Sequence, residues 1–339
     1  MMSEPPRNSI LRTIRDILLA IAVLTTLLIL ESFLNHLHPF FDSLTDIRVP
    51  LAILTIILSV FLLFTTMRRQ GFILIIFAVA VIAASYNYGS LSQTSLKNSQ
   101  PVIKLLQTNL RFDNKTPEKL LELIDHENPD IITLQEGSKK WGEFFQANGL
   151  TMMGCSSKND RIGTTGVILS KEFLQRFGAL KPTALDCYEA LSTRGYVAEL
   201  SLTREDQNTL LFRIISTHLS WPWPFGQNLQ LDELENNSSI TGFSTVNTPT
   251  IVAGDFNSVT WSNTVSRMEK LTATHHVSGI GPTWLSYKFP DFLRPYLGLP
   301  IDQVLLSKQF YPVSVKRMPS IGSDHLPIMV EFQFDPDQK

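Results

Sequence analysis

The sequence is poor in cysteine. Cys155 and Cys187 are the only two among 339 residues. Neither has a second Cys or a His close enough in the chain to form the usual ligand spacing of a zinc site, which argues against one. One disulfide between them is permitted, but the sequence alone does not establish it.

The sequence also lacks an excess of positive charge. It has 29 Lys and Arg against 31 Asp and Glu, and six of the former and five of the latter precede residue 97, so the rest carries a net charge of about −3. A protein that binds duplex nucleic acid through many phosphates normally has a basic face. This balance counts against a nucleic-acid substrate, and only a local basic patch would restore that option.

Charged residues are missing from three long runs in the first third of the chain, which are residues 17–30 (extending to 34 if Glu31 lies at an interface), 49–67 and 71–96. A bilayer-crossing helix needs about 20 apolar residues. The first run is closer to the core of a signal peptide, but no small-x-small cleavage site follows it. We predict a membrane anchor over residues 1–96 with about three transmembrane helices, roughly 16–34, 49–67 and 71–90. The alternative is a soluble hairpin of buried helices.

Arginines flank the predicted spans unevenly. Arg7, Arg12 and Arg15 precede the first span, and Arg68 and Arg69 lie between the second and third. Positive loops tend to stay in the cytoplasm. We therefore expect a multi-pass protein of the cell (inner) membrane whose remaining residues, 97–339, are extracytoplasmic.

The chain after the predicted anchor begins with a strand, a helix and a strand. Residues 101–109 form an apolar strand that ends at Asn109, a helix follows from Thr116, and residues 131–134 form a strand that ends just before Glu136. This order predicts two neighbouring parallel strands, so Asn109 and Glu136 should meet at the sheet edge where ligands usually bind. Glu136 is a candidate metal ligand, and a solvated helix cap is the alternative.

Further strands also end in polar residues. Residues 196–202 and 210–217 are expected to pair antiparallel, with His218 at the end, although a single His in such a place is more often structural. Residues 250–258 predict a buried strand that delivers Asp255 and Asn257. These two side chains would point to the same side if the strand geometry continues, and an acceptor beside an amide donor suits a phosphate and its attacking water.

Other segments of the chain repeat this arrangement. A strand is expected at 163–170, a short helix at 263–270, a strand opening near Asp302, and a closing strand at 327–334 that is preceded by Asp324 and His325. Each polar motif alone is weak evidence for a functional site. The interpretation rests on the recurrence of such motifs, in order, at strand ends.

Six motifs now stand in order: Gln-Thr-Asn-Leu from 107, Leu-Gln-Glu from 134, Ser-Thr-His-Leu from 216, Gly-Asp-Phe-Asn from 254, Ile-Asp-Gln-Val-Leu-Leu-Ser from 301, and Ser-Asp-His-Leu-Pro-Ile from 323. The set resembles the endonuclease/exonuclease/phosphatase superfamily, in its membrane-anchored branch, over about residues 102–334. The resemblance implies an α/β (α+β) four-layer sandwich of two mixed sheets flanked by helices, here preceded by the three predicted transmembrane helices. The catalytic groups would lie in a cleft at one end.

The resemblance also implies roles for site residues. The catalytic set is His218, Asp255, Asn257, Asp302 and His325, and the metal set, for Mg²⁺ or Mn²⁺, is Asn109, Glu136 and Asp324. Asp255 and Asn257 would position or deprotonate the attacking water. His325, oriented by Asp302, would bind a phosphate oxygen, and His218 would be a second donor.

The chain departs from the family pattern at two positions. Arg111 stands where many nucleases of the superfamily carry an acid, which bears on a second metal ligand there, and Gln303 follows Asp302 where an aromatic residue or His is frequent.

Two aromatic segments, 221–225 and 284–296, are expected to border the cleft or, alternatively, to cover the edges of the sandwich. We consider three functions. The first is a membrane-anchored, metal-dependent phosphoesterase acting on a lipid-linked phosphate or another ester that is not nucleic acid. The second is a DNA or RNA nuclease of the same mechanism, and the third is a catalytically dead, membrane-tethered binding module.

Overall fold

The structure is a computed structural model that describes residues 7–86, 101–156, 164–177, 180–189, 196–204, 210–236 and 248–335. The chain separates into two compact units, Met1–Tyr88 and Gly89–Lys339.

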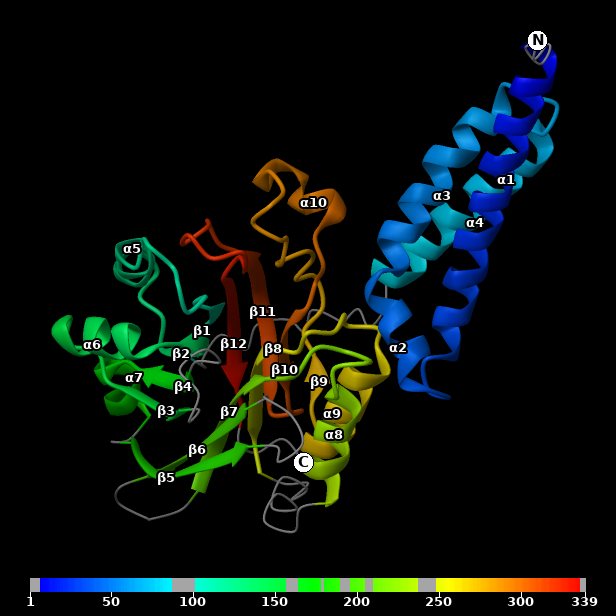
Figure 1. Ribbon diagram of the computed structural model, residues 1–339. Coiled ribbons are helices and arrows are strands. Elements are labelled where there is room, and N and C mark those ends of the chain that lie inside the picture. Colours follow the sequence, from blue (N-terminus) through cyan, green and yellow to red (C-terminus); the bar gives the residue numbers. More distant parts are fainter. Residues whose placement is uncertain are drawn as a thin grey trace. The chain divides into compact units, whose positions relative to one another are not determined.

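The first unit is a bundle of helices (Figure 1). Its elements are α1 (Arg7–Glu31), the 3₁₀ turn η1 (Ser32–Leu34), α2 (Pro39–Asp46), α3 (Arg48–Leu63) and α4 (Arg68–Tyr86). Small side chains allow the long helices to pack, since Ala22, Ala52 and Ala78 are fully buried. Large apolar side chains such as Phe64 and Ile73 remain exposed, as expected of helices that face lipid.

Two helical stretches, Ser9–Leu34 with 26 residues and Arg68–Tyr86 with 19, are long and apolar enough to cross a membrane. The predicted middle span, 49–67, corresponds to α3, which ends at Leu63 and is joined to the preceding α2 at a bend of 61°. At 1.5 Å per residue, the 16 residues of α3 reach about 24 Å, less than the roughly 30 Å of a bilayer core. The expected number of three spans therefore holds if the bent pair counts as one. Residues 87–90 of the predicted third span lie outside the described residues.

The second unit contains two six-stranded sheets (Figure 1). Sheet one has the order β11-β12-β1-β2-β4-β3 and sheet two the order β5-β6-β7-β8-β10-β9. Their bounds are β1 (Val102–Asn109), β2 (Ile131–Gly137), β3 (Met152–Ser156), β4 (Thr164–Leu169), β5 (Leu180–Glu189), β6 (Tyr196–Arg204), β7 (Leu210–His218), β8 (Thr250–Asp255), β9 (His275–His276), β10 (Asp302–Leu306), β11 (Phe310–Arg317) and β12 (Ile328–Phe334). Both sheets are mixed, because β1 and β2 pair parallel, as do β7 and β8, while the other pairs are antiparallel. The predicted parallel pair and the predicted antiparallel pair of β6 with β7 are both confirmed.

Helices α5 (Glu118–Glu127) and α6 (Lys139–Ala147) cover the outer face of sheet one, and α8 (Gln227–Asn236) and α9 (Asn263–Thr272) cover that of sheet two. The remaining short helices are α7 (Lys171–Arg176), whose Phe173 packs between the sheets, the 3₁₀ turn η3 (Asp291–Leu293) and α10 (Arg294–Leu297). One buried cluster fills the space between the sheets, a second joins sheet one to α5 and α6, and a third joins sheet two to α8 and α9. This is the predicted four-layer sandwich.

A disulfide joins the two sheets at their edges. Cys155 on β3 bonds to Cys187 on β5, with the two Cα atoms 5.5 Å apart. Because β3 is the last strand of sheet one and β5 the first strand of sheet two, the bond closes the sandwich along one side.

Candidate active site

The layer between the sheets changes from apolar to polar at one end. Along β1, alternate residues face this layer, and Ile103 and Leu105 belong to the core cluster between the sheets. The same periodicity brings Gln107 and Asn109 to this face, and both are fully buried. The strand thus passes from a hydrophobic core into a polar site without a change of face.

Four other strands repeat this change. Their inward positions run from apolar residues to Thr133 and Gln135 on β2, Ser216 and His218 on β7, Asp255 on β8, and Asp302 on β10. Backbone pairing places Asp255 beside His218 on one side and beside Asp302 on the other. The site therefore forms where strand ends from both sheets meet.

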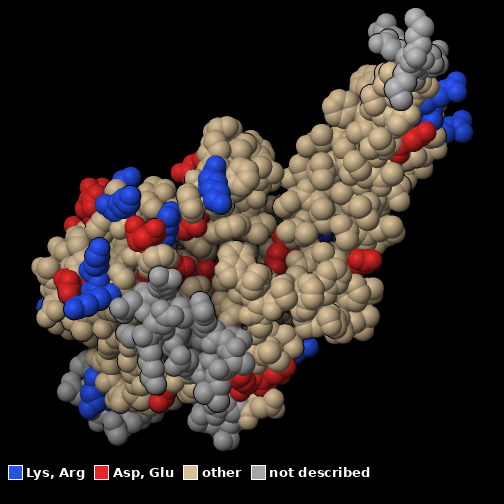
Figure 2. Space-filling model, in the orientation of Figure 1, with Lys and Arg blue, Asp and Glu red and all other residues tan. Residues whose placement is uncertain are grey.

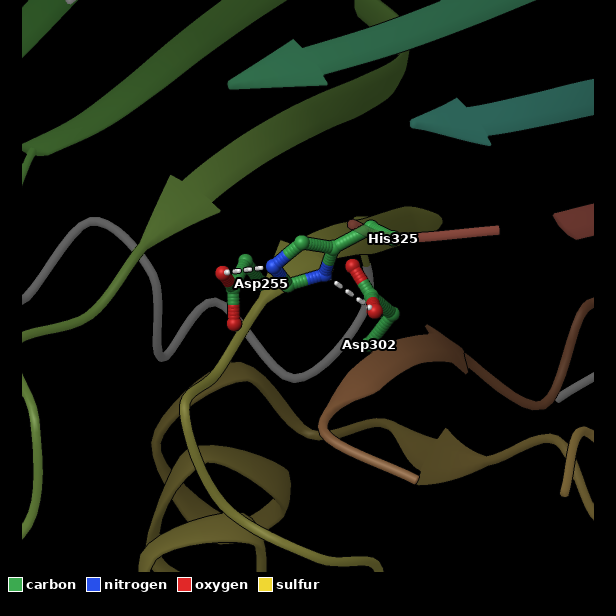
Figure 3. Close-up of side chains that lie close together, drawn as sticks. All are labelled: Asp255, Asp302 and His325. Carbon is green, nitrogen blue, oxygen red and sulfur yellow. Dashed lines mark hydrogen bonds and ion pairs between the residues drawn. The ribbon is translucent and has the colours of Figure 1, made fainter. Parts of the chain in front are cut away.

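The ring of His325 lies between two carboxylates (Figure 3). Its Nδ1 is 2.8 Å from Oδ2 of Asp302, and its Nε2 is 3.5 Å from Oδ2 of Asp255. All three residues are buried. The loop before β12 holds the histidine backbone, because its N–H donates to Oγ of Ser323 at 3.1 Å.

Electrostatics keep this histidine charged. Burial lowers the pKa of His325, but the negative charges of Asp302 and Asp255 outweigh burial and raise the pKa to about 10. Burial raises the pKa of the Asp255 carboxyl above its ordinary range, against the lowering influence of the His325 charge. At neutral pH the site therefore holds an imidazolium with both N–H groups facing carboxylates.

Asn109 and Glu136 converge on the same point. Nδ2 of Asn109 donates to Oδ2 of Asp255 at 3.0 Å and to Oε1 of Glu136 at 3.1 Å, while Oδ1 of Asn109 accepts from the backbone N–H of Arg111 at 3.0 Å. Two carboxylates thus approach one amide group. The prediction that Asn109 and Glu136 meet at one sheet edge is borne out by the parallel pairing and by this contact.

Glu136 reaches the site through an irregular backbone. Simple alternation would place it on the outer face with Ile132 and Leu134, which pack under the helices. Its φ is 55° and the pairing of β2 with β4 shifts register between Leu134 and Gly137. This left-handed residue at a bulge redirects the side chain toward Asn109.

Asn257 also lies in a left-handed conformation, with φ of 48°. The strand ends at Asp255, so the expectation that strand geometry continues to residue 257 is wrong. The turn instead lets the backbone N–H of Asn257 donate to Oδ1 of Asp255 at 2.8 Å, and its Nδ2 donates to the carbonyl of Leu219 at 2.8 Å. Asn257 therefore holds Asp255 through its backbone while its side chain ties two loops together.

The two remaining predicted residues border this group. His218 Nε2 lies 3.7 Å from Oδ2 of Asp255. Oδ2 of Asp324 accepts from Nε1 of Trp284 at 3.3 Å, and the charge of Asp324 contributes to the raised pKa of the adjacent His325.

Sequence reasoning missed a buried polar network below the histidine. Nε2 of Gln107 donates to Oδ1 of Asp302 at 3.1 Å and to Oε1 of Gln135 at 2.9 Å. Thr133 donates to Oε1 of Gln107, and Thr283 donates to the other carboxylate oxygen of Asp302. Gln107 has a signal in the sequence, because it lies two residues before Asn109 and therefore on the same strand face.

Asp255, Asp302 and His325 offer three ligand atoms within 4.8 Å of one another, a spacing that a metal ion requires. However, both oxygens of Asp302 already accept hydrogen bonds, and the two ring nitrogens of His325 already face Asp302 and Asp255. The Glu136 carboxylate is only half-buried and lies at the convergence point of Asn109 and Asp255. Oxygen donors suit a hard divalent cation, so the donor set fits such an ion better at Glu136.

Arg111 places a positive charge two residues after Asn109, at a position where the family often carries an acid. The Arg111 guanidinium lies 4.6 Å from the ring centroid of Tyr287 and bonds to Asp113, and its φ is 57°. Asp113, followed by the charges of Asp324 and Tyr287, raises the pKa of Arg111 against burial. This arginine therefore links the strand end after Asn109 to the second aromatic segment.

The two mixed sheets, with polar strand ends gathered at one end between them, are also found in a known family of proteins. Residues 106–325 match the Endonuclease/Exonuclease/phosphatase family. Because this match covers more than half of the sequence, the chain belongs to that family. None of the curated proteins compared matches the sequence.

Solved structures show the same fold at low identity. An endonuclease/exonuclease/phosphatase from Bacteroides vulgatus is 15% identical with a TM-score of 0.54, and the match covers 70% of this chain and all of that one. The human Nocturnin catalytic domain with bound sulfate is 18% identical with a TM-score of 0.53, over 69% of this chain and 94% of that one. A mannosyl-6-phosphatase from Bacteroides thetaiotaomicron is 13% identical with a TM-score of 0.50, over 68% of this chain and all of that one.

Proposed function

We propose that this protein is a membrane-anchored, divalent-metal-dependent phosphoesterase that attacks a phosphate ester with water, and that its natural substrate is a lipid-linked phosphate. The observation that carries the proposal is the convergence of Asn109, Glu136, Asp255 and His325 at one end of the sandwich, within hydrogen-bonding or ion-pair distance of Asp255 or of one another. Family membership supports hydrolysis of a phosphate ester as the reaction class.

The charged His325 is placed to neutralise a phosphate. Phosphate esters resist attack because their oxygens are anionic, so a positive donor must offset the charge that builds up as water approaches. In the proposed mechanism His325 turns Nε2–H from Asp255 to a non-bridging phosphate oxygen, and Asp302 holds Nδ1 so that the ring keeps its orientation. His218 supplies a second donor from the neighbouring strand end.

Asp255 is the proposed base. Its raised pKa makes it a better proton acceptor than an exposed carboxylate, and the Asn257 backbone N–H fixes its other oxygen. Asp255 accepts a proton from water as the new O–P bond forms, and the bond from phosphorus to the leaving oxygen breaks, so that the leaving group departs with the electron pair as an alkoxide and takes a proton from solvent. Glu136, Asn109 and Asp324 would hold Mg²⁺ or Mn²⁺, which when bound supplies further positive charge to the phosphate oxygens.

Two features support the membrane location and an extracytoplasmic active site. Ser9–Leu34 and Arg68–Tyr86 have the length and apolarity of membrane spans, and the arginine clusters favour a cytoplasmic location for the loops that carry them. A disulfide between Cys155 and Cys187 fits an oxidising compartment, since such bonds are rare in the cytosol.

The test uses the full chain in detergent micelles or nanodiscs with Mg²⁺ and a panel of lipid, sugar and small phosphate esters. We expect turnover that EDTA abolishes and Mg²⁺ restores. His325→Gln and Glu136→Gln should each lower kcat at least about 100-fold. The matched controls His126→Gln and Glu143→Gln replace residues with exposed side chains and should keep full activity. Unchanged turnover in both site variants would contradict the assignment, and plasmid nicking by the same preparation would favour the nuclease.

A further inference from the structure

Large exposed aromatic side chains lie in the segment that follows His218 and in the segment that precedes Asp302. Six of them form what we call the aromatic rim, and each exposes between 45% and 72% of its surface: Trp221, Trp223, Phe225, Tyr287, Phe292 and Tyr296. At roughly 200 Å² per aromatic side chain, the exposed rim amounts to roughly 700 Å². This exceeds the few hundred Å² at which an exposed apolar patch usually marks an interaction surface.

The rim is connected to the catalytic groups. Trp221 follows His218 by three residues, and its ring contacts that of Trp284 with centroids 5.5 Å apart. Trp284 in turn donates to Asp324, the neighbour of His325. On the other side, Tyr287 lies against Arg111. Whatever binds the rim is therefore held at the entrance to the site.

A buried arginine anchors the protruding part of the rim. Arg294 donates through Nη1 to the carbonyls of Thr283 and Asp324, both at 2.7 Å, and pairs through Nη2 with Asp291. The lobe of residues 284–297, which carries α10, is thus attached to the two segments that hold Asp302 and His325. In Figure 2 this lobe is mostly tan, with few charged side chains on the face shown.

The chemistry of the rim fits a bilayer surface. Trp and Tyr concentrate at the membrane–water boundary, because their rings bury an apolar body while keeping a polar group wet. In this sequence only 15 residues separate Tyr86, where α4 ends, from Val102, where β1 begins, a maximal reach of about 50 Å. A domain on such a tether stays near the membrane that holds its helices.

We propose that the aromatic rim docks on the lipid bilayer that anchors the chain and so presents the site to a phosphate carried on a lipid at that surface. The proposal rests on the proposed function and deepens it by naming where the substrate lies. It explains why the six aromatic side chains of the rim belong to none of the buried clusters.

The tryptophans allow a direct test in the full-length protein. All five lie between residues 141 and 284, and none lies in the first 96 residues. Trp141 and Trp261 are buried, at 3% and 6% exposure, so they give a constant background. With the chain in nanodiscs, lipids brominated near the headgroup should quench Trp221 and Trp223 but leave the buried tryptophans unaffected.

The decisive variant is the triple change Phe225→Ser, Phe292→Ser and Tyr296→Ser, which keeps every tryptophan. We expect it to remove most of the quenching and to lower turnover of a lipid phosphate in the same nanodisc by about tenfold or more. Turnover of p-nitrophenyl phosphate should not change, because none of the three residues belongs to the proposed catalytic group. Leu185→Ser and Leu210→Ser remove side chains that are 39% and 41% exposed elsewhere on the sandwich, and should leave quenching at the wild-type level.

Three outcomes distinguish bilayer docking from dimerisation and from failure of the proposed function. Absence of quenching in the wild type, or quenching that survives the triple change, would overturn the docking proposal. If quenching is absent, and mass photometry shows dimers that the triple change converts to monomers, then the rim binds a second copy of the chain and not the bilayer. Quenching that follows the expected pattern in a protein without turnover on any phosphoester would uphold docking and count against the proposed function.

Discussion

Replacing Gly254 by alanine would insert a methyl group into the contact between β7 and β8. A Cβ at residue 254 would overlap the carbonyl oxygen of Thr217 and would lie within 3 Å of the carbonyl carbon and the nitrogen of the same residue. All three atoms belong to the backbone, so relief requires the strands themselves to move by about 1 Å. Overpacking of this kind costs typically 1–3 kcal/mol, and we expect about 3 kcal/mol here because no side chain can yield.

This displacement would also reach the site. Thr217 pairs with Gly254, and the next pair along the two strands is His218 with Asp255. A shift of about 1 Å between catalytic groups can lower a rate about 100-fold. Gly254→Ala is therefore expected to lose both stability and turnover.

The matched control is Gly142→Ala. Gly142 lies within α6, and a Cβ there would meet no atom within 4 Å. Alanine should stabilise this helix by about 0.4–1 kcal/mol.

The assay is thermal unfolding of the full chain, followed by tryptophan fluorescence, whose signal comes entirely from the second unit. At about 2–4 °C per kcal/mol for a domain of this size, Gly254→Ala should lower Tm by roughly 6–12 °C and Gly142→Ala should raise it by roughly 1–3 °C. If the Gly254→Ala protein has the same Tm and the same turnover as the wild type, the described packing of β7 against β8 is refuted.

Three further outcomes are expected. Burial lowers the pKa of His325, but the flanking carboxylates raise it to about 10. In the unfolded chain the pKa of a histidine is about 6.5. The stability that the His325 charge provides is therefore fully present below about pH 6.5 and is lost as the pH rises through about 10. The Tm difference between wild type and His325→Gln should shrink over that interval, and a constant difference would contradict the ion pair. Gln107→Leu should lower kcat about tenfold with little change in KM, whereas Thr108→Val, which removes a buried hydroxyl with no partner among the described residues, should have little effect. Reduction of the disulfide, whose two cysteines are 32 residues apart, should cost about 3–4 kcal/mol and lower Tm by roughly 6–16 °C, and an unchanged Tm would show that the bond does not constrain the fold.

Much of the second unit follows from strand periodicity. Apolar residues at alternate positions end in Asn109, His218 and Asp255, and because side chains on a strand repeat every two residues, these polar groups share a face with the core. The order of strands and helices then predicts which strand ends are neighbours within a sheet.

Other features depend on contacts that local sequence does not encode. The hydrogen bond from Gln107 to Asp302 joins residues 195 positions apart on different sheets. The left-handed backbones at Glu136 and Asn257 contradict the local preference of strand ends, and tertiary contacts stabilise them. The bend between α2 and α3 and the pairing of Cys155 with Cys187 likewise arise from packing rather than from any pattern in neighbouring residues.

The link from Gln107 on one sheet to Asp302 on the other has a consequence for biogenesis. Neither sheet alone holds a working set of groups, since Asn109 and Glu136 are synthesised with the first strands of the second unit and Asp302 and His325 with its last strands. Under the proposed mechanism an unfinished chain, or one still crossing the membrane, is inert, and hydrolysis begins only after both sheets have closed on each other. A protease cut anywhere between the two contributions that lets the sheets part would silence the enzyme as completely as the loss of a catalytic side chain.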